Sequence, residues 1–372
     1  MEKLEPFLFD QKTTLVNLTS SLLAHYGVTP FHATIPEVDE VMKGHQKIAF
    51  LLFDGSGEFN LGQYPHTTRF IREHKLMTIH SVNPATTVAC TTALLTGKNP
   101  IENGWLGWSL YIDGYGDPID VFPNTDSLTD AKIATPEVMK TMCPLTYIDA
   151  LLKEKGVKAR LDLQAPLWDG KGPKKLKDLS LHAKTFFAEG GQFYYGYWTN
   201  PDHIIHEKGV RSWSLHHTLR QINHAVKKFV KENPDVLVFT LADHGLINVQ
   251  YRDIKAFPLV ENCLRKPCAM EGRTCSFFIK PEMKEQFERE FNKEFGDRFV
   301  LVKTEDLLKE HYFGEGEINP HASASLGEYI AIATKDQLLM DTRTHSKYTV
   351  HEGHHAGATK EEKEILLAAY NR

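Results

Sequence analysis

Two residues with metal-binding side chains, Asp243 and His244, stand side by side at the end of an apolar run over residues 236–242. The length and composition of this run predict a buried strand, and Gly245 lets the chain turn after it. A carboxylate and an imidazole are both ligands of divalent metals, and open α/β sheets place their sites at the carboxyl ends of strands. The pair therefore indicates a metal site. Taken alone, it is equally consistent with a solvated turn that carries one of the 19 histidines.

Two further strand ends carry the same kinds of side chain. The apolar run 47–53 leads directly into Asp54, and the aromatic run 193–198 is followed by Asp202 and His206. Because Asp202 and His206 are four positions apart, one turn of helix would put both on the same face. Each residue taken singly is better explained as a turn, cap or surface residue. Their repetition at successive strand ends favours a shared metal site.

A fourth segment supplies a candidate nucleophile. The run 76–82 predicts another strand, and residues 85–97 predict a short helix that ends at Gly97. Thr86 or Thr87 opens this helix, where free N–H groups and the helix dipole favour an alkoxide or a bound phosphate. A threonine hydroxyl is a poor nucleophile at neutral pH unless a base or a metal activates it. Without nearby carboxylates, an ordinary N-cap threonine would be the better interpretation.

A histidine-rich, glycine-flanked segment at residues 351–362 offers a last imidazole, for which His354 and His355 compete. Such loops can also face solvent. With this segment included, the set of motifs resembles the alkaline phosphatase superfamily, and most closely its branch of type I phosphodiesterases and nucleotide pyrophosphatases. The resemblance extends from Asp54 to Glu362.

The resemblance implies a role for each motif. The family's nucleophilic threonine falls on Thr87, ten residues before Gly97, and its last histidine ligand falls on His355. Two metal sites are implied, one held by Asp202, His206 and His355 and the other by Asp54, Asp243, His244 and Thr87. Each set mixes carboxylate oxygen with imidazole nitrogen, which suits two zinc ions with positions open for substrate, and manganese is the alternative.

The activity implied by the resemblance is a two-metal phosphoryl-transfer hydrolase that acts on small phosphate esters through Thr87. One alternative is a phosphomonoesterase or phosphonate hydrolase of the same superfamily, and another is a metal-binding sensor or inert relative. Members of this branch commonly carry an Asn that helps to hold a phosphoryl oxygen. The matching position in this chain falls in the segment 104–108, which contains no Asn. Trp108 there offers a single N–H donor, which leaves the substrate open.

The charge around the nucleophile bears on the type of ester. Lys98 is the only Lys or Arg from position 76 to position 131. A phosphomonoester dianion usually needs a further cationic donor, whereas a diester needs apolar contact for its second organic group. We therefore expect a preference for diesters. Stacking on the substrate is expected from Trp105, Trp108 or Tyr111, although each is as well explained as a core residue, and Lys171, Lys174 or Lys175 folded over the site would reverse the expectation.

Strand-like and helix-like segments alternate along the chain. This pattern predicts an α/β three-layer sandwich with a mostly parallel central sheet and a small inserted α+β subdomain. We expect a catalytic core from residues 1–256 and 320–372, with the subdomain at 257–319. The subdomain is predicted to contain strands at 275–279 and 299–302 and a charged helix at 281–295. The core is then expected to resume with a strand at 329–333. Other helices are predicted at 14–24, 144–155, 212–231 and 360–370.

Composition indicates a globular enzyme of the cytoplasm. The chain has 372 residues, of which 41% are hydrophobic and 24% charged, and it shows neither a secretory leader nor a membrane-spanning stretch. Its five cysteines lack any Cys-x-x-Cys spacing and are expected as free thiols, with a third metal at Cys263, Cys268 and Cys275 as the lesser alternative. A net charge of −5 gives no footprint for nucleic-acid polymers, and no membrane partner is expected.

Overall fold

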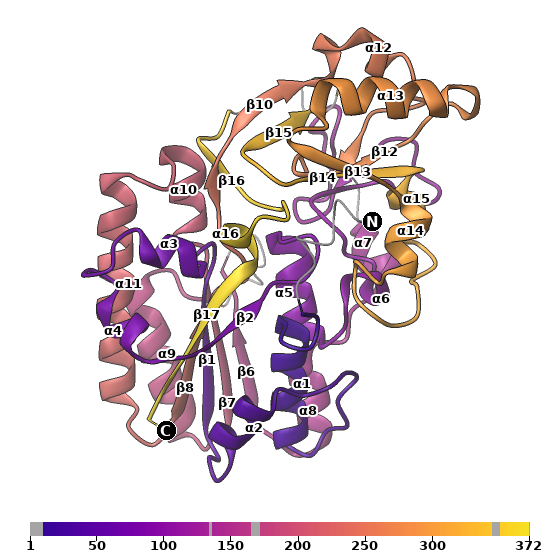
Figure 1. The fold of residues 1–372 in the computed structure, drawn as a ribbon. Helices are drawn as coiled ribbons and strands as arrows, with labels where there is room; N and C mark the ends of the chain where they lie inside the picture. Colours follow the sequence, from indigo (N-terminus) through magenta and orange to yellow (C-terminus); the bar gives the residue numbers. More distant parts are fainter. Residues whose placement is uncertain (1–9, 134–135, 165–171, 344–349, 372) are drawn as a thin grey trace.

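The largest sheet of the protein has six strands in the order β2-β17-β8-β1-β7-β6 (Figure 1). The computed structural model describes residues 10–133, 136–164, 172–343 and 350–371. The four strands from β8 to β6 are parallel, whereas β17 is antiparallel to both of its neighbours. In sheet order the strands are Lys75–His80, Glu364–Tyr370, Leu237–Leu241, Ile48–Phe53, Phe193–Trp198 and Ala159–Asp162.

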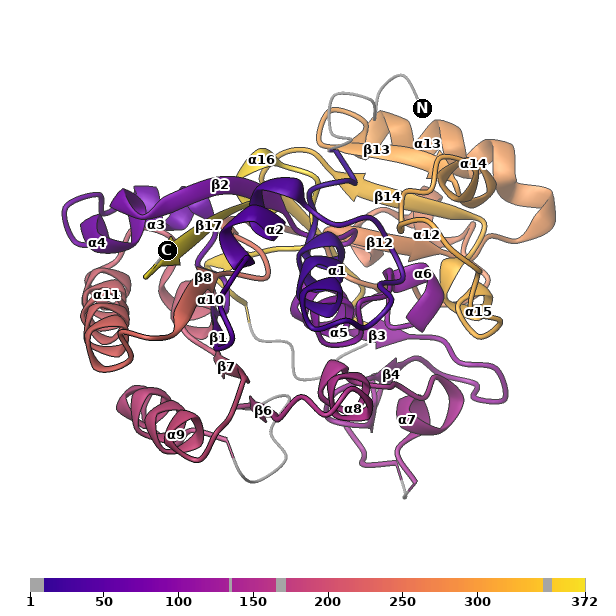
Figure 2. The ribbon, with the colours of Figure 1, turned by 90° about the horizontal axis from the view of Figure 1, so that it is seen from below.

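Helices cover both faces of this sheet, as Figures 1 and 2 show. Alternate residues of β1 pack toward opposite sides, so that Phe50 belongs to one hydrophobic cluster and Leu51 to the other. One face is covered by α1 (Leu15–His25), α2 (Pro36–Met42), α5 (Thr87–Thr96) and α8 (Ile148–Glu154). The other is covered by α3 (Glu58–Gly62), α4 (Arg69–Glu73), α9 (Leu176–Ala188) and α11 (Trp213–Glu232). The predicted three-layer α/β sandwich is confirmed.

A second, antiparallel sheet of seven strands lies beside the first, in the order β13-β14-β12-β11-β3-β4-β5. In that order its strands are Phe299–Lys303, Tyr329–Ala333, Thr274–Phe277, Ala269–Met270, Ser109–Leu110, Ile119–Asp120 and Thr125–Asp126. The helices that accompany it include α12 (Pro258–Glu261), α13 (Lys284–Phe295), α14 (Thr304–Lys309) and α15 (Ser323–Leu326). Residues far apart in the chain therefore share this sheet.

The remaining described elements connect these layers. They are α6 (Pro100–Asn103), α7 (Val138–Met142), α10 (Asp202–Lys208), α16 (Lys360–Lys363), β9 (Ile247–Asn248), β10 (Gln250–Asp253), β15 (Gln337–Met340), β16 (Gly353–His354), and the 3-10 helices Ile254–Ala256 and Pro281–Met283. Strand β10 pairs with β15, and β9 pairs with β16. Among the described helices, none has the length and apolar composition that a membrane crossing requires.

One predicted element is wrong, and one predicted strand forms in a different sheet from the one expected. Residues 360–370 form one turn of helix, α16, and then the strand β17, because the apolar residues after it fill a place between β2 and β8. The strand at 329–333 exists as β14, but it pairs with β12 and β13 in the second sheet and does not return to the core sheet. The strands and the helix predicted within 257–319 do form, although their sheet also contains β3, β4, β5 and β14. The domain boundaries themselves stay a prediction.

Candidate active site

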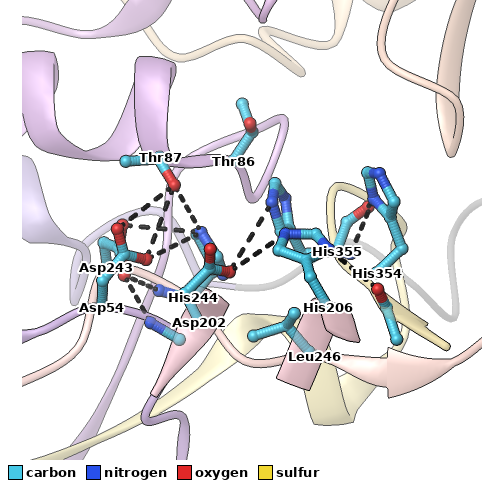
Figure 3. A network of polar contacts seen from close by, with 12 residues as sticks. Asp54, Thr86, Thr87, Asp202, His206, Asp243, His244, Leu246, His354 and His355 are labelled. Atoms are coloured by element: carbon cyan, nitrogen blue, oxygen red, sulfur yellow. Dashed lines mark hydrogen bonds and ion pairs between the residues drawn. The ribbon is translucent and has the colours of Figure 1, made fainter. Parts of the chain in front are cut away.

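The candidate ligands gather at one edge of the six-stranded sheet (Figure 3). Asp54 follows β1, Asp243 lies two residues after β8, and Asp202 opens α10 beyond β7. These three strands are parallel neighbours, with Phe53 in register with Trp198. Because their carboxyl ends meet at the same edge, side chains placed just after each strand converge.

The first group of ligands consists of Asp202, His206 and His355. Asp202 Oδ1 lies 3.3 Å from His206 Nε2 and 3.9 Å from His355 Nε2. His206 Nδ1 donates to the carbonyl of Gly353 at 2.8 Å, which directs its Nε2 at the group. Burial, followed by the neighbouring His244 imidazole, lowers the pKa of His355 well below its usual range, so His355 is neutral as a metal ligand must be.

The second group consists of Asp54, Asp243 and His244. His244 Nε2 lies 3.5 Å from Asp54 Oδ1 and 3.5 Å from Asp243 Oδ2. The other oxygen of Asp243, Oδ1, accepts hydrogen bonds from the backbone N–H groups of Gly55 and His244 at 3.1 and 3.0 Å. The backbone therefore anchors one oxygen of this carboxylate and leaves the other to face the group.

The two groups fit divalent cations. Asp202 Oδ1 and Asp243 Oδ2 are buried and accept no hydrogen bond from the described residues, a costly state for a carboxylate oxygen that has no cation. Burial, and then the carboxylates of Asp243 and Asp202, raise the pKa of Asp54 well above its usual range. Metal ions at the two groups would offset this repulsion and satisfy the unpaired oxygens.

Thr87 and Thr86 face different partners at the start of α5. Thr87 Oγ1 lies 3.5 Å from each carboxylate oxygen of Asp54 and 3.1 Å from His244 Nε2. Thr86 is the N-cap of the helix, but its hydroxyl donates to Glu271 Oε1 at 2.6 Å instead of capping the helix. Figure 3 shows Thr87, and not Thr86, directed at the second group.

The alternative metal ligands, His354 and the three cysteines, lie outside both groups. His354 Nδ1 contacts only the backbone of His355 among the described residues, although its ring lines the cavity. Cys263, Cys268 and Cys275 are buried and unpaired, and no third cluster of ligands gathers around them in the part of the chain that the structure describes.

Of the aromatic and basic residues that were expected near the substrate, only Trp108 lines the cavity among those that the structure describes. Trp105 and Tyr111 are core residues, whereas Trp108 is 36% exposed and is among the residues that line the cavity. Lys174 and Lys175 are exposed and do not line it, and Lys171 lies outside the described residues.

The structure adds site residues that sequence reasoning missed. Tyr197 donates its hydroxyl proton to Asp54 Oδ2, and Asn60 brackets the turn after His244 by hydrogen bonds of 3.0 Å to both backbone groups of Leu246. Alternation within the aromatic run 193–198 marks Tyr197 as buried but gives no sign of its partner. Glu271 comes from the β11–β12 hairpin of the second sheet, and nothing in the sequence indicates that it contacts Thr86.

The site opens into a cavity of about 640 Å³. Asp54, Thr87, Asp202, His206 and His355 line one part of it. The rest is lined mainly by residues of β3, β4, the β11–β12 hairpin and β15. The strand ends of the central sheet thus supply most of the candidate metal ligands, and the second sheet with β15 supplies much of the wall that a substrate would contact.

Comparison with known proteins agrees with this architecture. Residues 49–357 match the family described as type I phosphodiesterase / nucleotide pyrophosphatase. A search among curated proteins gives no match.

Solved structures share the fold at low identity. An inactive variant of murine ectonucleotide pyrophosphatase/phosphodiesterase 5 in complex with AMP has a TM-score of 0.61 and 14% identity, with 88% of each chain covered. The human protein of the same name has a TM-score of 0.63 and 13% identity, with 87% of this chain and 88% of the other covered. By its match over residues 49–357, the chain belongs to the type I phosphodiesterase / nucleotide pyrophosphatase family, hydrolases of phosphoric ester bonds.

Proposed function

We propose that this protein hydrolyses phosphodiesters with Thr87 as nucleophile and two divalent metal ions as cofactors. The observation that carries the proposal is the position of Thr87 Oγ1, which lies 3.1 Å from His244 Nε2 and 3.5 Å from Asp54 at the start of α5. A binding protein without catalysis has no need of a hydroxyl at this place.

Two sets of residues would hold the metals. Asp202, His206 and His355 would form one site. Asp54, Asp243, His244 and Thr87 would form the other. When bound, the ions supply Lewis-acid stabilisation of the phosphoryl oxygens and lower the pKa of a bound hydroxyl or water. The mixed carboxylate and imidazole ligands suit zinc, with manganese as the alternative.

The residues of the chain position and activate the reacting groups. Thr87 Oγ loses its proton and attacks phosphorus, so that a bond from phosphorus to Thr87 forms while the bond to the leaving alcohol breaks and the alcohol gains a proton. The first free N–H groups of α5 face the phosphoryl oxygens. Water then attacks phosphorus, and Thr87 recovers its hydroxyl proton as the phosphoryl product leaves.

The charge of the cavity favours diesters over monoesters. None of the described residues that line the cavity is Lys or Arg, and Lys98 instead lies over the ring of Phe31, 5.1 Å from its centre. A monoester dianion therefore has no cationic side chain to pair with its extra charge. We expect kcat/KM for an aryl phosphodiester to exceed that for the matching monoester, and the reverse order would instead support a phosphomonoesterase.

Substitution of the two threonines tests the nucleophile. With zinc or manganese added, hydrolysis of bis(p-nitrophenyl) phosphate should fall at least about a thousand-fold in Thr87→Ala. Thr87→Ser should keep a measurable part, because the hydroxyl survives. Metal content should stay near that of the wild type in both variants. Thr86→Ala is the control for the register, since Thr86 faces Glu271, and the proposal is wrong if it is the inactive variant and Thr87→Ala is active.

A further inference from the structure

A fully buried ion pair joins the second sheet to the C-terminal part of the chain. Arg273, which directly precedes β12, and Glu362, in α16, both have 0% of their surface exposed. The guanidinium donates from Nε to Glu362 Oε1 at 2.7 Å and from Nη2 to Oε2 at 2.8 Å. Its Nη1 donates to the carbonyl of Gln337 in β15 at 2.6 Å. Because the desolvation of two charges offsets their attraction, stability alone is a weak explanation for such a pair.

Glu362 also holds the loop that carries His355. Its Oε1 accepts from the backbone N–H of Gly357 at 2.7 Å. Its Oε2 accepts from the hydroxyl of Thr359 at 2.7 Å and from the backbone N–H of the same residue at 3.3 Å. Each oxygen of the carboxylate is therefore shared between Arg273 and the loop that follows His355.

The imidazole of His355 has no such anchor of its own. Its Nδ1 is buried and has no hydrogen-bond partner among the described residues, whereas Nδ1 of His206 donates to a backbone carbonyl. The orientation of the His355 ring therefore depends on the backbone of its loop. The start of that loop is held where the N–H of Ala356 donates to the carbonyl of Ala85 at 2.9 Å, and the next residues are held by Glu362.

The ion pair and the loop are packed against each other without spare room. A Cβ atom at Gly357 would lie 2.6 Å from Arg273 Nη2 and 2.6 Å from Glu362 Oε2. The loop that carries His244 has a different contact, because the N–H of Gly245 donates to the backbone carbonyl of Glu362 at 2.9 Å. A change in the carboxylate therefore acts first on the loop at Gly357.

We propose that Arg273 and Glu362 are positioning residues that set the metal affinity of the group containing His355. The guanidinium fixes the carboxylate, the carboxylate fixes the backbone after His355, and this backbone places the imidazole beside Asp202 and His206. The inference rests on the proposed function and goes beyond it by naming residues outside both ligand groups that control one of them. Contacts that orient ligands in this way change metal affinity by roughly 10–100-fold.

The affinities of the two groups for zinc test the inference. Glu362→Gln replaces one oxygen by an NH2 group that accepts neither from Arg273 nor from the loop. Chelator competition should show one Kd for zinc raised about ten-fold or more and the other unchanged within about two-fold. Two variants that keep both buried charges should show the same pattern. Gly357→Ala pushes the loop away from the pair, and Arg273→Lys removes the fork of two parallel donors.

Proteins that lack one ligand group assign the weakened ion. Asp243→Asn should retain the ion of the group that contains His355, and addition of Glu362→Gln should weaken its binding about ten-fold. His206→Ala should retain the ion of the other group, and addition of Glu362→Gln should leave its affinity unchanged. Weakening only in the His206→Ala protein, or equal weakening in both, would overturn the inference.

A second buried carboxylate separates positioning from general destabilisation. Asp162 is 1% exposed and accepts from Arg160 Nε at 2.7 Å, and it belongs to neither ligand group. Asp162→Asn should keep both wild-type affinities for zinc even if its Tm falls, and an equal loss in Asp162→Asn and Glu362→Gln would overturn the inference. Selective weakening in Glu362→Gln without any phosphodiester hydrolysis by the wild type would reject the proposed function alone. Hydrolysis by the wild type with unchanged affinities in Glu362→Gln would reject this inference alone.

Discussion

Three of the candidate ligands, Asp54, His206 and Asp243, have one atom anchored by the protein and another directed at the site. Asp243 Oδ1 is held by two backbone N–H groups, and His206 Nδ1 is held by the carbonyl of Gly353. Asp54 is held by the hydroxyl of Tyr197. Such outer contacts orient a ligand and tune its basicity. At the scale of single residues, metal affinity therefore depends on side chains that never touch the metal.

Replacement of Tyr197 measures the value of such a contact. Tyr197→Phe should weaken metal binding at the group that contains Asp54 by roughly 10–100-fold, because Asp54 loses its hydrogen-bond donor. Competition with a zinc chelator gives the affinity. Tyr195→Phe is the matched control, because the Tyr195 hydroxyl is buried in the same strand without a hydrogen-bond partner among the described residues. Equal affinities in the two variants would show that the Tyr197 contact is only structural.

The raised pKa of Glu271 predicts that the stability of the folded protein depends on pH. Burial raises this pKa from an ordinary value of 4.5 to about 7, so between these pH values the folded protein binds more protons than the unfolded chain. The free energy of unfolding should therefore decrease as pH rises from 4.5 to 7, by roughly 3 kcal/mol from this residue. Urea unfolding with a chelator present should show this slope in the wild type and a flatter one in Glu271→Gln. A difference between the two proteins that is constant with pH would contradict the prediction.

At the scale of elements, sequence patterns predicted what is local. The apolar runs before Asp54 and Asp243 are strands, and the segment that carries Asp202 and His206 is a helix. The pairing of distant segments was not predictable in this way. Residues 364–370 contain Leu and Ala, which favour helix, but their place between β2 and β8 decides for a strand. Likewise, short strands near residue 110 gain their identity only by pairing with the hairpin at 269–277.

The position of β17 makes a quantitative prediction. Leu367 is fully buried in the middle of this strand, so Leu367→Ala should lower the free energy of unfolding by about 2–5 kcal/mol. Leu181→Ala is the control, because Leu181 is 62% exposed on α9 and should change stability little. Chemical denaturation of both variants gives the comparison. Similar small losses would fit a surface helix at 360–370 instead of a central strand.

At the scale of the whole molecule, the site ties together segments from both ends of the sequence. Asp54 and His355 belong to the two different ligand groups, and neither group forms in an unfolded chain. Binding of metals to the folded state alone stabilises it by mass action.

Removal of metal should therefore affect both activity and stability. The reconstituted protein should hold about two zinc or manganese ions per chain, and a chelator should abolish hydrolysis and lower Tm. Asp202→Asn should bind about one ion fewer and show a smaller shift of Tm. Elemental analysis and thermal unfolding measure the two effects. A Tm that does not change on chelation would contradict the ligand assignment.

The central place of β17 also bears on how the chain is made. It is the last strand of the six-stranded sheet in sequence, yet it separates β2 from β8. During synthesis, both of these strands emerge with an unpaired edge, which is a template for pairing with other chains. The nascent protein must keep these edges apart until residues 364–370 leave the ribosome, so its yield in the cell should depend on chaperones that shield exposed strands.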